Sequence, residues 1–298
     1  MTRHLGPADG DSLGPERFAD VDGVRLCYQS VGDPADPTVL LVGGVGSPMD
    51  WWPADLCAAL AERGRHVVRY DHRDTGRSTT CPPGAPDYTG RDLAEDALRV
   101  LDDLGVARAH LVGLSMGGVI AQELALEHPD RVAGLTLVAT SRAVRGPGDA
   151  DLPPSAPELH GLWDGPSPDP ADTAALVDAA VAEDRALTGR GDFDESRTRA
   201  VAARAVERST DPTAGTNHFA AEPGAPFAGT LADVGVPTLV VHGREDPLFP
   251  GHGAALAAEI PGARLLLLDG VGHQVPPPSS WEVLLPALVE HTRERDEP

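Results

Sequence analysis

The sequence is poor in cysteine. Among its 298 residues only Cys27, Cys57 and Cys81 are cysteine, and none of them forms a Cys-x-x-Cys pair. An odd number of cysteines without that spacing argues against a disulfide framework and against a thiolate metal site. We therefore expect a protein of a reducing, cytoplasmic compartment.

Basic residues and long apolar runs are also scarce. The chain has 24 Lys and Arg against 46 Asp and Glu, a formal net charge of −22. A surface of that sign repels phosphate backbones and anionic lipids, and a solvated acidic surface needs no ligand. No apolar run approaches the roughly 20 residues of a membrane span, and the N-terminus has no apolar signal core. We expect neither nucleic acid nor a membrane as a partner.

Aromatic residues make up only 4% of the chain, so few side chains are available to build a bulky pocket wall. A content of 41% hydrophobic and 23% charged residues is that of a globular protein. Each of these large side chains can either line a pocket or pack in the core, and the sequence leaves both open. The candidates for a substrate pocket are Gly44, Trp51, Trp52, Trp163 and Phe219.

The stretch 110–129 places a serine between a strand pattern and a helix pattern. The apolar pair Leu111 and Val112 leads into Gly113-Leu114-Ser115-Met116-Gly117, and an apolar helical pattern follows. Gly-x-Ser-x-Gly in this position is typical of a nucleophile elbow, a sharp turn that exposes the serine hydroxyl. A Cβ at either glycine would collide with the neighbouring strand or helix. We predict that Ser115 is a nucleophile.

Strand and helix patterns alternate through most of the chain, which indicates the α/β class. Asp22-Gly23 is a hairpin signal between the first two strands, and the later strands are short apolar runs typical of a buried parallel sheet. We predict a mostly parallel eight-stranded sheet flanked by helices. The expected strands are 18–21, 24–31, 38–42, 66–70, the run before Ser115, 132–139, 236–242 and 264–268.

The alternation stops at position 144. Seven prolines lie between 147 and 170, followed by helical patterns over 173–188 and 195–208 and by no strand-like run until about 230. We predict a helical cap over 144–230, inserted after the sixth strand of a core formed by 18–143 and 231–298. A disordered linker is the alternative for the proline-rich half. Residues 1–17 are expected to be a flexible tail.

A serine at an elbow needs a base to take its proton and a carboxylate to orient that base. Asp246 follows the strand 236–242, and His273 follows the strand 264–268 and a Gly-x-Gly turn. The order Ser, Asp, His is that of a hydrolase with a nucleophile elbow. Glu245 is the close competitor for the acid, and His242 at a strand end is better explained by packing. No other histidines have ligand-like spacing, so we expect no metal.

Several motifs together resemble the α/β-hydrolase superfamily from residue 18 to the end. Within it the chain is similar to actinobacterial esterases of the aclacinomycin methylesterase type, which remove methyl esters from anthracycline polyketides. The motifs are the run 69–80 (Arg-Tyr-Asp-His-Arg-Asp-Thr-Gly-Arg-Ser-Thr-Thr), 112–117, 236–240, Asp246-Pro247 and Gly272-His273.

This resemblance implies an ester hydrolase that works through an acyl-enzyme, without a cofactor, on a small or medium apolar ester held under the cap. Its oxyanion hole is expected to use the backbone N–H of Met116, directly after the nucleophile, and by analogy that of Val45. Gly43 departs from the family, because many relatives carry a histidine there that ties the oxyanion loop together.

Other reactions share the same three residues. Epoxide hydrolases and dehalogenases place Asp at the elbow, so Ser115 argues against both. Lactonases, carbon–carbon hydrolases and cofactor-free haloperoxidases or perhydrolases stay open. A non-hydrolytic biosynthetic protein or a ligand-binding protein on the same scaffold is a further alternative, which the presence of all three residues disfavours. The sequence leaves the oligomeric state open.

Overall fold

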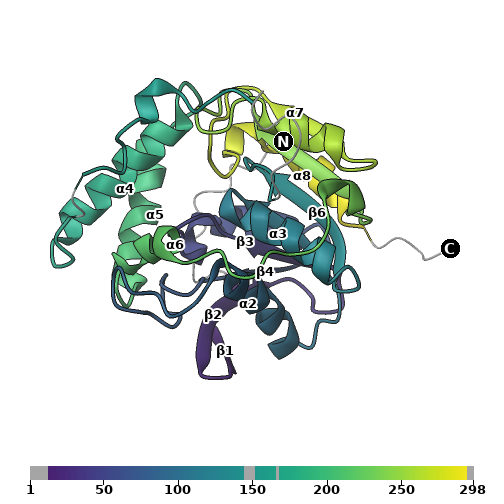
Figure 1. Ribbon diagram of the computed structural model, residues 1–298, viewed down its shortest axis with the longest axis horizontal. Helices are drawn as coiled ribbons and strands as arrows, with labels where there is room; N and C mark the ends of the chain where they lie inside the picture. The colour runs from purple at the N-terminus through teal and green to yellow at the C-terminus, as the bar shows by residue number, and fades with distance from the viewer. Residues whose placement is uncertain (1–12, 144–151, 166–167, 294–298) are drawn as a thin grey trace.

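An eight-stranded sheet forms the centre of the computed structural model, which describes residues 13–143, 152–165 and 168–293 (Figure 1). The strand order is β1-β2-β4-β3-β5-β6-β7-β8, with antiparallel pairs at β1–β2 and β2–β4 and parallel pairs elsewhere. The predicted α/β class with a mostly parallel eight-stranded sheet is confirmed. The strands are β1 (Arg17–Val21), β2 (Val24–Val31), β3 (Thr38–Val42), β4 (His66–Tyr70), β5 (Ala109–Leu114), β6 (Val132–Val138), β7 (Thr238–Gly243) and β8 (Arg264–Leu268).

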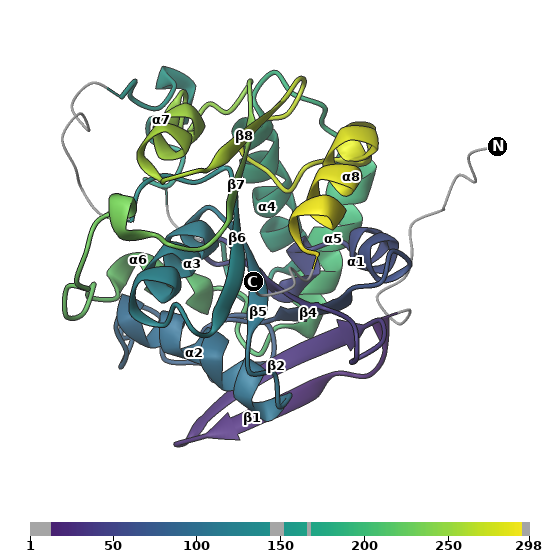
Figure 2. The same ribbon diagram turned by 90° about the vertical axis from the view of Figure 1, so that its right-hand side faces the viewer.

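Helices cover both faces of the sheet because the central strands are apolar on both sides. In β3, Val39 and Leu41 enter the core on one face, whereas Leu40 and Val42 enter the core on the other. The first face packs against α1 (Ala54–Ala61) and α8 (Trp281–His291), which lie together in Figure 2. The second face packs against α2 (Gly90–Asp103), α3 (Met116–Glu127) and α7 (His252–Glu259). Because β3 to β8 run parallel, their carboxyl ends all lie at the same edge of the sheet.

Local sequence signals account for several element boundaries. Asp22 and Gly23 form the β1–β2 turn, and both have positive φ (52° and 83°). A two-residue hairpin turn needs this conformation to match the twist of its two strands. Helix α2 begins with a capping box in which Thr89 and Asp92 bond each other's backbone N–H groups. The apolar face of α2 then repeats at helical spacing and is buried on the sheet.

The segment between β6 and β7 is helical in its described part, 152–165 and 168–230, which we call the cap. Helices α4 (Thr173–Thr188) and α5 (Glu195–Arg208) occupy the ranges expected from the sequence, and α6 (Asn217–Ala220) follows. Figure 1 shows α4 and α5 as a pair beside the sheet. Short 3-10 turns complete the elements: η2 (Met49–Trp51), η4 (Pro157–Leu159), η5 (Ala214–Thr216), η6 (Leu231–Asp233) and η7 (Pro278–Ser280).

Helix α5 is fixed to the core by arginine side chains. Arg208 bonds both carboxylate oxygens of Asp71, at 2.7 and 2.8 Å, and contacts Asp50 at 2.9 Å. Arg204 bonds the other oxygen of Asp50 at 2.9 Å, and Glu16 accepts from Arg208 at 3.0 Å. Both aspartates are almost fully buried, so α5 is held by charge pairs shielded from water.

Part of the expected N-terminal tail packs on this core. Leu13 is buried among apolar side chains, and Glu16 joins the ion pairs described above. Residues 1–12 of the expected tail, and 144–151 and 166–167 of the expected cap, lie outside the described residues. In the part of the chain that is described, none of the helices has both the length and the apolarity that crossing a bilayer would require.

Candidate active site

Ser115 lies at a strained turn between β5 and α3. Its backbone has φ 51° and ψ −115°, a conformation that residues with a side chain rarely adopt. A Cβ at Gly113 would come within 2.2 Å of the Gly117 carbonyl oxygen, and one at Gly117 within 2.2 Å of the Val42 carbonyl oxygen. The collisions expected at both glycines are confirmed. The turn is therefore closed by backbone packing, and it directs Ser115 to the edge of the sheet.

Asp246 and His273 meet at the same edge. Asp246 follows β7, His273 follows β8, and His273 Nδ1 lies 3.1 Å from Asp246 Oδ2. The other carboxylate oxygen accepts the backbone N–H groups of Leu248 and Phe249 at 2.9 and 2.8 Å. Burial alone would raise the pKa of Asp246, but these bonds and His273 outweigh it and lower the pKa. Asp246 is thus a carboxylate fixed in contact with the imidazole.

The two competitors identified in the sequence do not take these positions. Glu245 is exposed to solvent. His242 is buried, with Nε2 2.9 Å from the Phe249 carbonyl oxygen and 3.4 Å from Asp246 Oδ2. Burial lowers the pKa of His242, so the ring stays neutral and donates to the Phe249 carbonyl. His242 therefore packs behind the aspartate.

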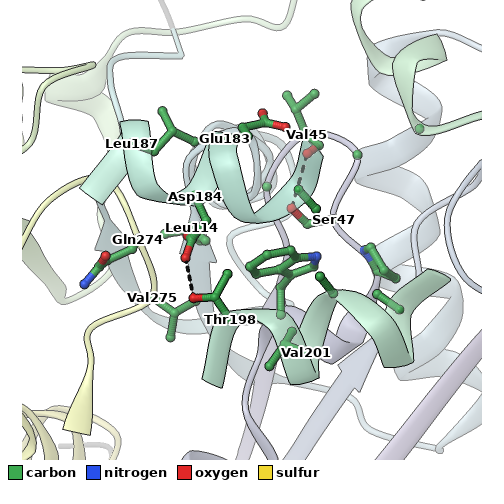
Figure 3. A pocket seen from close by; sticks show the side chains of 18 of the residues that line it. Val45, Ser47, Leu114, Glu183, Asp184, Leu187, Thr198, Val201, Gln274 and Val275 are labelled. Carbon is green, nitrogen blue, oxygen red and sulfur yellow. Dashed lines mark hydrogen bonds between the residues drawn. The ribbon is translucent and has the colours of Figure 1, made fainter. Parts of the chain in front are cut away.

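Ser115 and His273 border one cavity of about 900 Å³ between the sheet edge and the cap. Among the described contacts there is no direct hydrogen bond between the Ser115 hydroxyl and the His273 ring. Gly44, Trp51, Trp163 and Phe219, four of the pocket candidates, also line this cavity. Figure 3 shows the walls contributed by Val45, Ser47 and Leu114 of the core, by Glu183, Asp184 and Leu187 of α4, and by Thr198 and Val201 of α5.

The loop after β3 approaches the serine from the other side. A Cβ at Gly44 would lie 3.6 Å from Ser115 Cβ, so the backbone of the loop passes beside this serine. Val45 follows in this loop and lines the cavity, and Met116 is the first residue of α3. A helix N-terminus carries partial positive charge, which favours an anion at this position.

Comparison with known proteins shows which family the chain belongs to. The family model described as the alpha/beta hydrolase fold matches residues 37–276. The chain belongs to the α/β-hydrolase family. Rhodomycin D methylesterase from Streptomyces peucetius is 36% identical over 299 residues, covering 94% of this chain and 98% of the relative. With that similarity over nearly its whole length, this α/β-hydrolase is a carboxylic ester hydrolase.

Solved structures extend the comparison. A hydrolase from Pseudomonas aeruginosa PA01 is 31% identical with a TM-score of 0.64, covering 94% of this chain and 97% of the other. The enol-lactonase from Burkholderia xenovorans LB400 is 27% identical, also with a TM-score of 0.64, covering 92% of this chain and 97% of the other.

One of the expected pocket residues is placed elsewhere in this α/β-hydrolase. Trp52 does not line the cavity: its side chain is 2% exposed and packs in the core with Leu56 and Leu60 of α1. Trp51 and Trp52 are neighbours at the end of a 3-10 turn, so their side chains point in different directions. Trp51 therefore faces the cavity and the cap, whereas Trp52 fills the space under α1.

Two histidines that the sequence did not single out hold the loop after β3. His72 Nε2 lies 3.1 Å from the Gly43 carbonyl oxygen, and His218 Nδ1 accepts the Gly46 N–H at 2.9 Å. The second ring nitrogen of His218 donates to the Arg73 carbonyl oxygen at 2.8 Å. These bonds hold the loop although Gly43 has no side chain to contribute. The motif 69–80 contains His72, but nothing local in the sequence links either ring to the loop.

No metal centre emerges from the described residues: within 13–143, 152–165 and 168–293, no three His, Cys, Asp or Glu side chains gather as ligands would. The three cysteines are all buried and free. Burial raises the pKa of Cys57 to about 11, so its thiol stays protonated and unreactive.

Proposed function

We propose that the protein is a serine esterase in which Ser115 is the nucleophile, His273 the general base and then acid, and Asp246 the residue that orients His273. One observation carries this proposal. The strained Ser115 and His273 border the same cavity, Asp246 contacts His273 from behind it, and the three residues follow three separate strands. The proposal does not require a direct bond from serine to histidine, because catalytic contacts often tighten only around a substrate.

In the first half of the reaction the Ser115 oxygen attacks the ester carbonyl carbon while His273 Nε2 takes the hydroxyl proton. The carbonyl electrons move to its oxygen, and the resulting oxyanion accepts hydrogen bonds from the N–H groups of Met116 and Val45. When the intermediate collapses, the carbon–oxygen bond to the alcohol breaks. His273 returns its proton to the departing alkoxide, which leaves as an alcohol.

In the second half a water molecule attacks the acyl-enzyme. His273 takes a proton from this water, and a second tetrahedral oxyanion forms in the same hole. Its collapse breaks the bond to the Ser115 oxygen, which regains the proton from His273. The products are a carboxylic acid and the free enzyme, and no cofactor takes part in any step.

The size and lining of the cavity support a bulky acyl group and a small alcohol. A volume of about 900 Å³ is large for a short-chain ester, and the cap supplies many of the apolar side chains in the walls. Rhodomycin D methylesterase, at 36% identity, is named for removing a methyl ester. We therefore propose the methyl ester of a polycyclic polyketide acid, of the anthracycline kind, as the substrate class.

The test compares Ser115→Ala with the wild-type protein on a chromogenic short-chain ester and on rhodomycin D. We expect the wild type to hydrolyse both, with a much lower KM for rhodomycin D, and Ser115→Ala to hydrolyse neither. A fluorophosphonate probe should label the wild type and leave Ser115→Ala unlabelled. Activity of Ser115→Ala at the wild-type level would show that another nucleophile acts.

A lactone is the second candidate substrate, because the enol-lactonase that resembles this chain covers it almost completely. A lactone is an internal ester, so the same three residues would open it without loss of an alcohol. Hydrolysis of an aliphatic enol-lactone and of rhodomycin D by one enzyme preparation separates the two. A higher kcat/KM for the lactone would favour this second candidate.

A further inference from the structure

Three consecutive peptide groups of the oxyanion loop are each held by a hydrogen bond. The Gly43 carbonyl oxygen lies 3.1 Å from His72 Nε2. The Gly44 carbonyl oxygen accepts the Ser47 N–H at 3.3 Å. The Val45 carbonyl oxygen accepts from the Ser47 hydroxyl at 3.2 Å, at the end of the cavity shown in Figure 3.

These bonds determine where the Val45 N–H points. In a trans peptide the carbonyl and the N–H point in opposite directions, and the Gly44 carbonyl and the Val45 N–H belong to one peptide group. Because the carbonyl faces Ser47, the N–H faces away from Ser47. Gly44 also lies against Ser115, so the peptide group that carries the Val45 N–H passes beside the serine.

The next peptide group is held from the cap. The Gly46 N–H donates to His218 Nδ1 at 2.9 Å, and Gly46 has the positive φ of 63° that a tight turn requires. The same ring bonds the Arg73 carbonyl through Nε2, which assigns one proton to Nε2 and a free lone pair to Nδ1. Burial lowers the pKa of His218, so the neutral ring persists.

His218 is itself rigidly placed. Its neighbour Asn217 is fully buried, donates to Asp74 at 2.9 Å and accepts the Gly84 N–H at 2.6 Å. Gly215 packs so closely on the loop that a Cβ there would lie 2.8 Å from Gly46 Cα. The groups facing the ring are His72, with ring centres 5.8 Å apart, Tyr88 at 6.4 Å, and the Asp74 carboxylate held by Asn217.

We propose that His218 is a positioning residue for catalysis, whose Nδ1 holds the oxyanion loop so that the Val45 N–H points at the reacting carbonyl oxygen. The proposal rests on the serine esterase function given above. Through His218 this part of the cap holds the oxyanion donor in place. The cap therefore contributes to the rate of the chemical step as well as to the shape of the pocket. His218 does not touch the substrate oxygen itself.

Two conservative variants separate the two bonds of the ring. In His218→Asn the side-chain oxygen takes the place of Nδ1 and can accept the Gly46 N–H. In His218→Gln the terminal NH₂ takes the place of Nε2 and can donate to the Arg73 carbonyl, but the bond to Gly46 is lost. A role in holding the cap alone predicts equal effects of the two changes.

We expect His218→Gln to lower kcat roughly 10- to 100-fold with little change in KM, since removal of a whole oxyanion donor costs about 10²- to 10³-fold. His218→Asn should recover most of that loss. Inhibition by a trifluoromethyl ketone, whose adduct with Ser115 carries the oxyanion, should weaken in His218→Gln in parallel with kcat/KM. Equal kcat values in the two variants at equal melting temperature would overturn the proposal.

The outcomes distinguish this proposal from the proposed function. If Ser115→Ala keeps its activity, the serine esterase function is wrong. If Ser115→Ala is inactive but His218→Gln keeps its kcat, only the role of His218 is wrong. Should His218→Gln not fold, Gly215→Ala displaces the loop by overlap with Gly46 and leaves the histidine in place. That variant should lower kcat by a similar factor, and an unchanged kcat would also overturn the proposal.

Discussion

His273 Nδ1 lies 3.1 Å from one oxygen of the Asp246 carboxylate, and the other oxygen is held by the backbone N–H groups of Leu248 and Phe249. The carboxylate therefore cannot rotate without breaking bonds on both sides. In the proposed mechanism the carboxylate accepts the Nδ1 proton and leaves Nε2 as the basic nitrogen of the ring. The orientation of the ring is thus set by a turn that follows a buried strand.

Asp246→Asn should lower kcat by about 10⁴-fold, the size of effect known for this change in a serine triad, because an amide favours the wrong tautomer of the ring. Initial rates on a chromogenic ester measure this effect. Glu245→Gln is the matched control, since Glu245 is the exposed neighbour of Asp246 and should keep the wild-type kcat. An equal loss in both variants would mean that the charge of the turn, rather than the bond to His273, supports catalysis.

Ser115→Gly should melt at a higher temperature than Ser115→Ala, although both should be inactive. The φ of 51° at this position strains any residue with a Cβ, and relief of such strain contributes about 1 kcal/mol or more, less the entropy that glycine loses on folding. Thermal melting of the two variants tests this. Equal melting temperatures would show that the elbow stores little strain.

The sequence predicts the elements of this site better than the contacts between them. The elbow, Asp246 and His273 are visible because each depends on a local pattern: a serine between glycines, or a polar residue after an apolar run. Helices α4 and α5 are visible for the same reason, through their apolar period. Local patterns decide local structure, and each of the three residues of the proposed triad lies in such a pattern.

The errors and omissions concern contacts between distant residues. Trp52 looks equivalent to Trp51 in the sequence, and only the packing of α1 on the sheet sends it into the core. The bond from His218 to Gly46 joins residues 172 positions apart, and no pattern in the chain indicates it. Such contacts follow from the topology of the sheet and the return of the cap onto it.

The pH dependence of stability should include a contribution from His72. Burial and, to a smaller extent, His218 lower the pKa of His72 from 6.5 to about 3, and the bond to the Gly43 carbonyl opposes this shift only weakly. The unfolded chain therefore binds this proton below pH 6.5, whereas the folded protein does not until about pH 3. The contribution to stability is complete above pH 6.5 and is lost progressively as the pH falls towards 3.

His72→Gln tests this directly, because its amide can still donate to the Gly43 carbonyl but does not titrate. Between pH 6.5 and about 3, the melting temperature of the variant should fall less than that of the wild type. Parallel curves for the two proteins would contradict a buried neutral histidine at this position.

Arg208→Ala should destabilise the protein by about 3–5 kcal/mol, the usual cost of removing one partner of a buried ion pair. The Arg208 side chain is 8% exposed, and its loss leaves the carboxylates of Asp71 and Asp50 without this partner. Arg199→Ala on the same helix is the control, since the Arg199–Asp178 pair is exposed and should matter little. Denaturant unfolding compares them, and a similar loss in both would mean that α5 itself, and not its anchor, was damaged.

Trp163→Ala should raise KM for a bulky polycyclic methyl ester about tenfold and leave the KM for a short-chain ester unchanged. The Trp163 ring lies 6.5 Å from the ring of Phe219 across the cavity wall, and its indole N–H bonds Glu183 of α4 at 2.8 Å. Loss of this surface removes about 2 kcal/mol of apolar contact at most, and only from an acyl group large enough to reach the cap. The ratio of the two KM values is the measurement. An equal rise for both esters would show that Trp163 shapes the cap as a whole, since a ligand held only near Ser115 has no direct contact to lose.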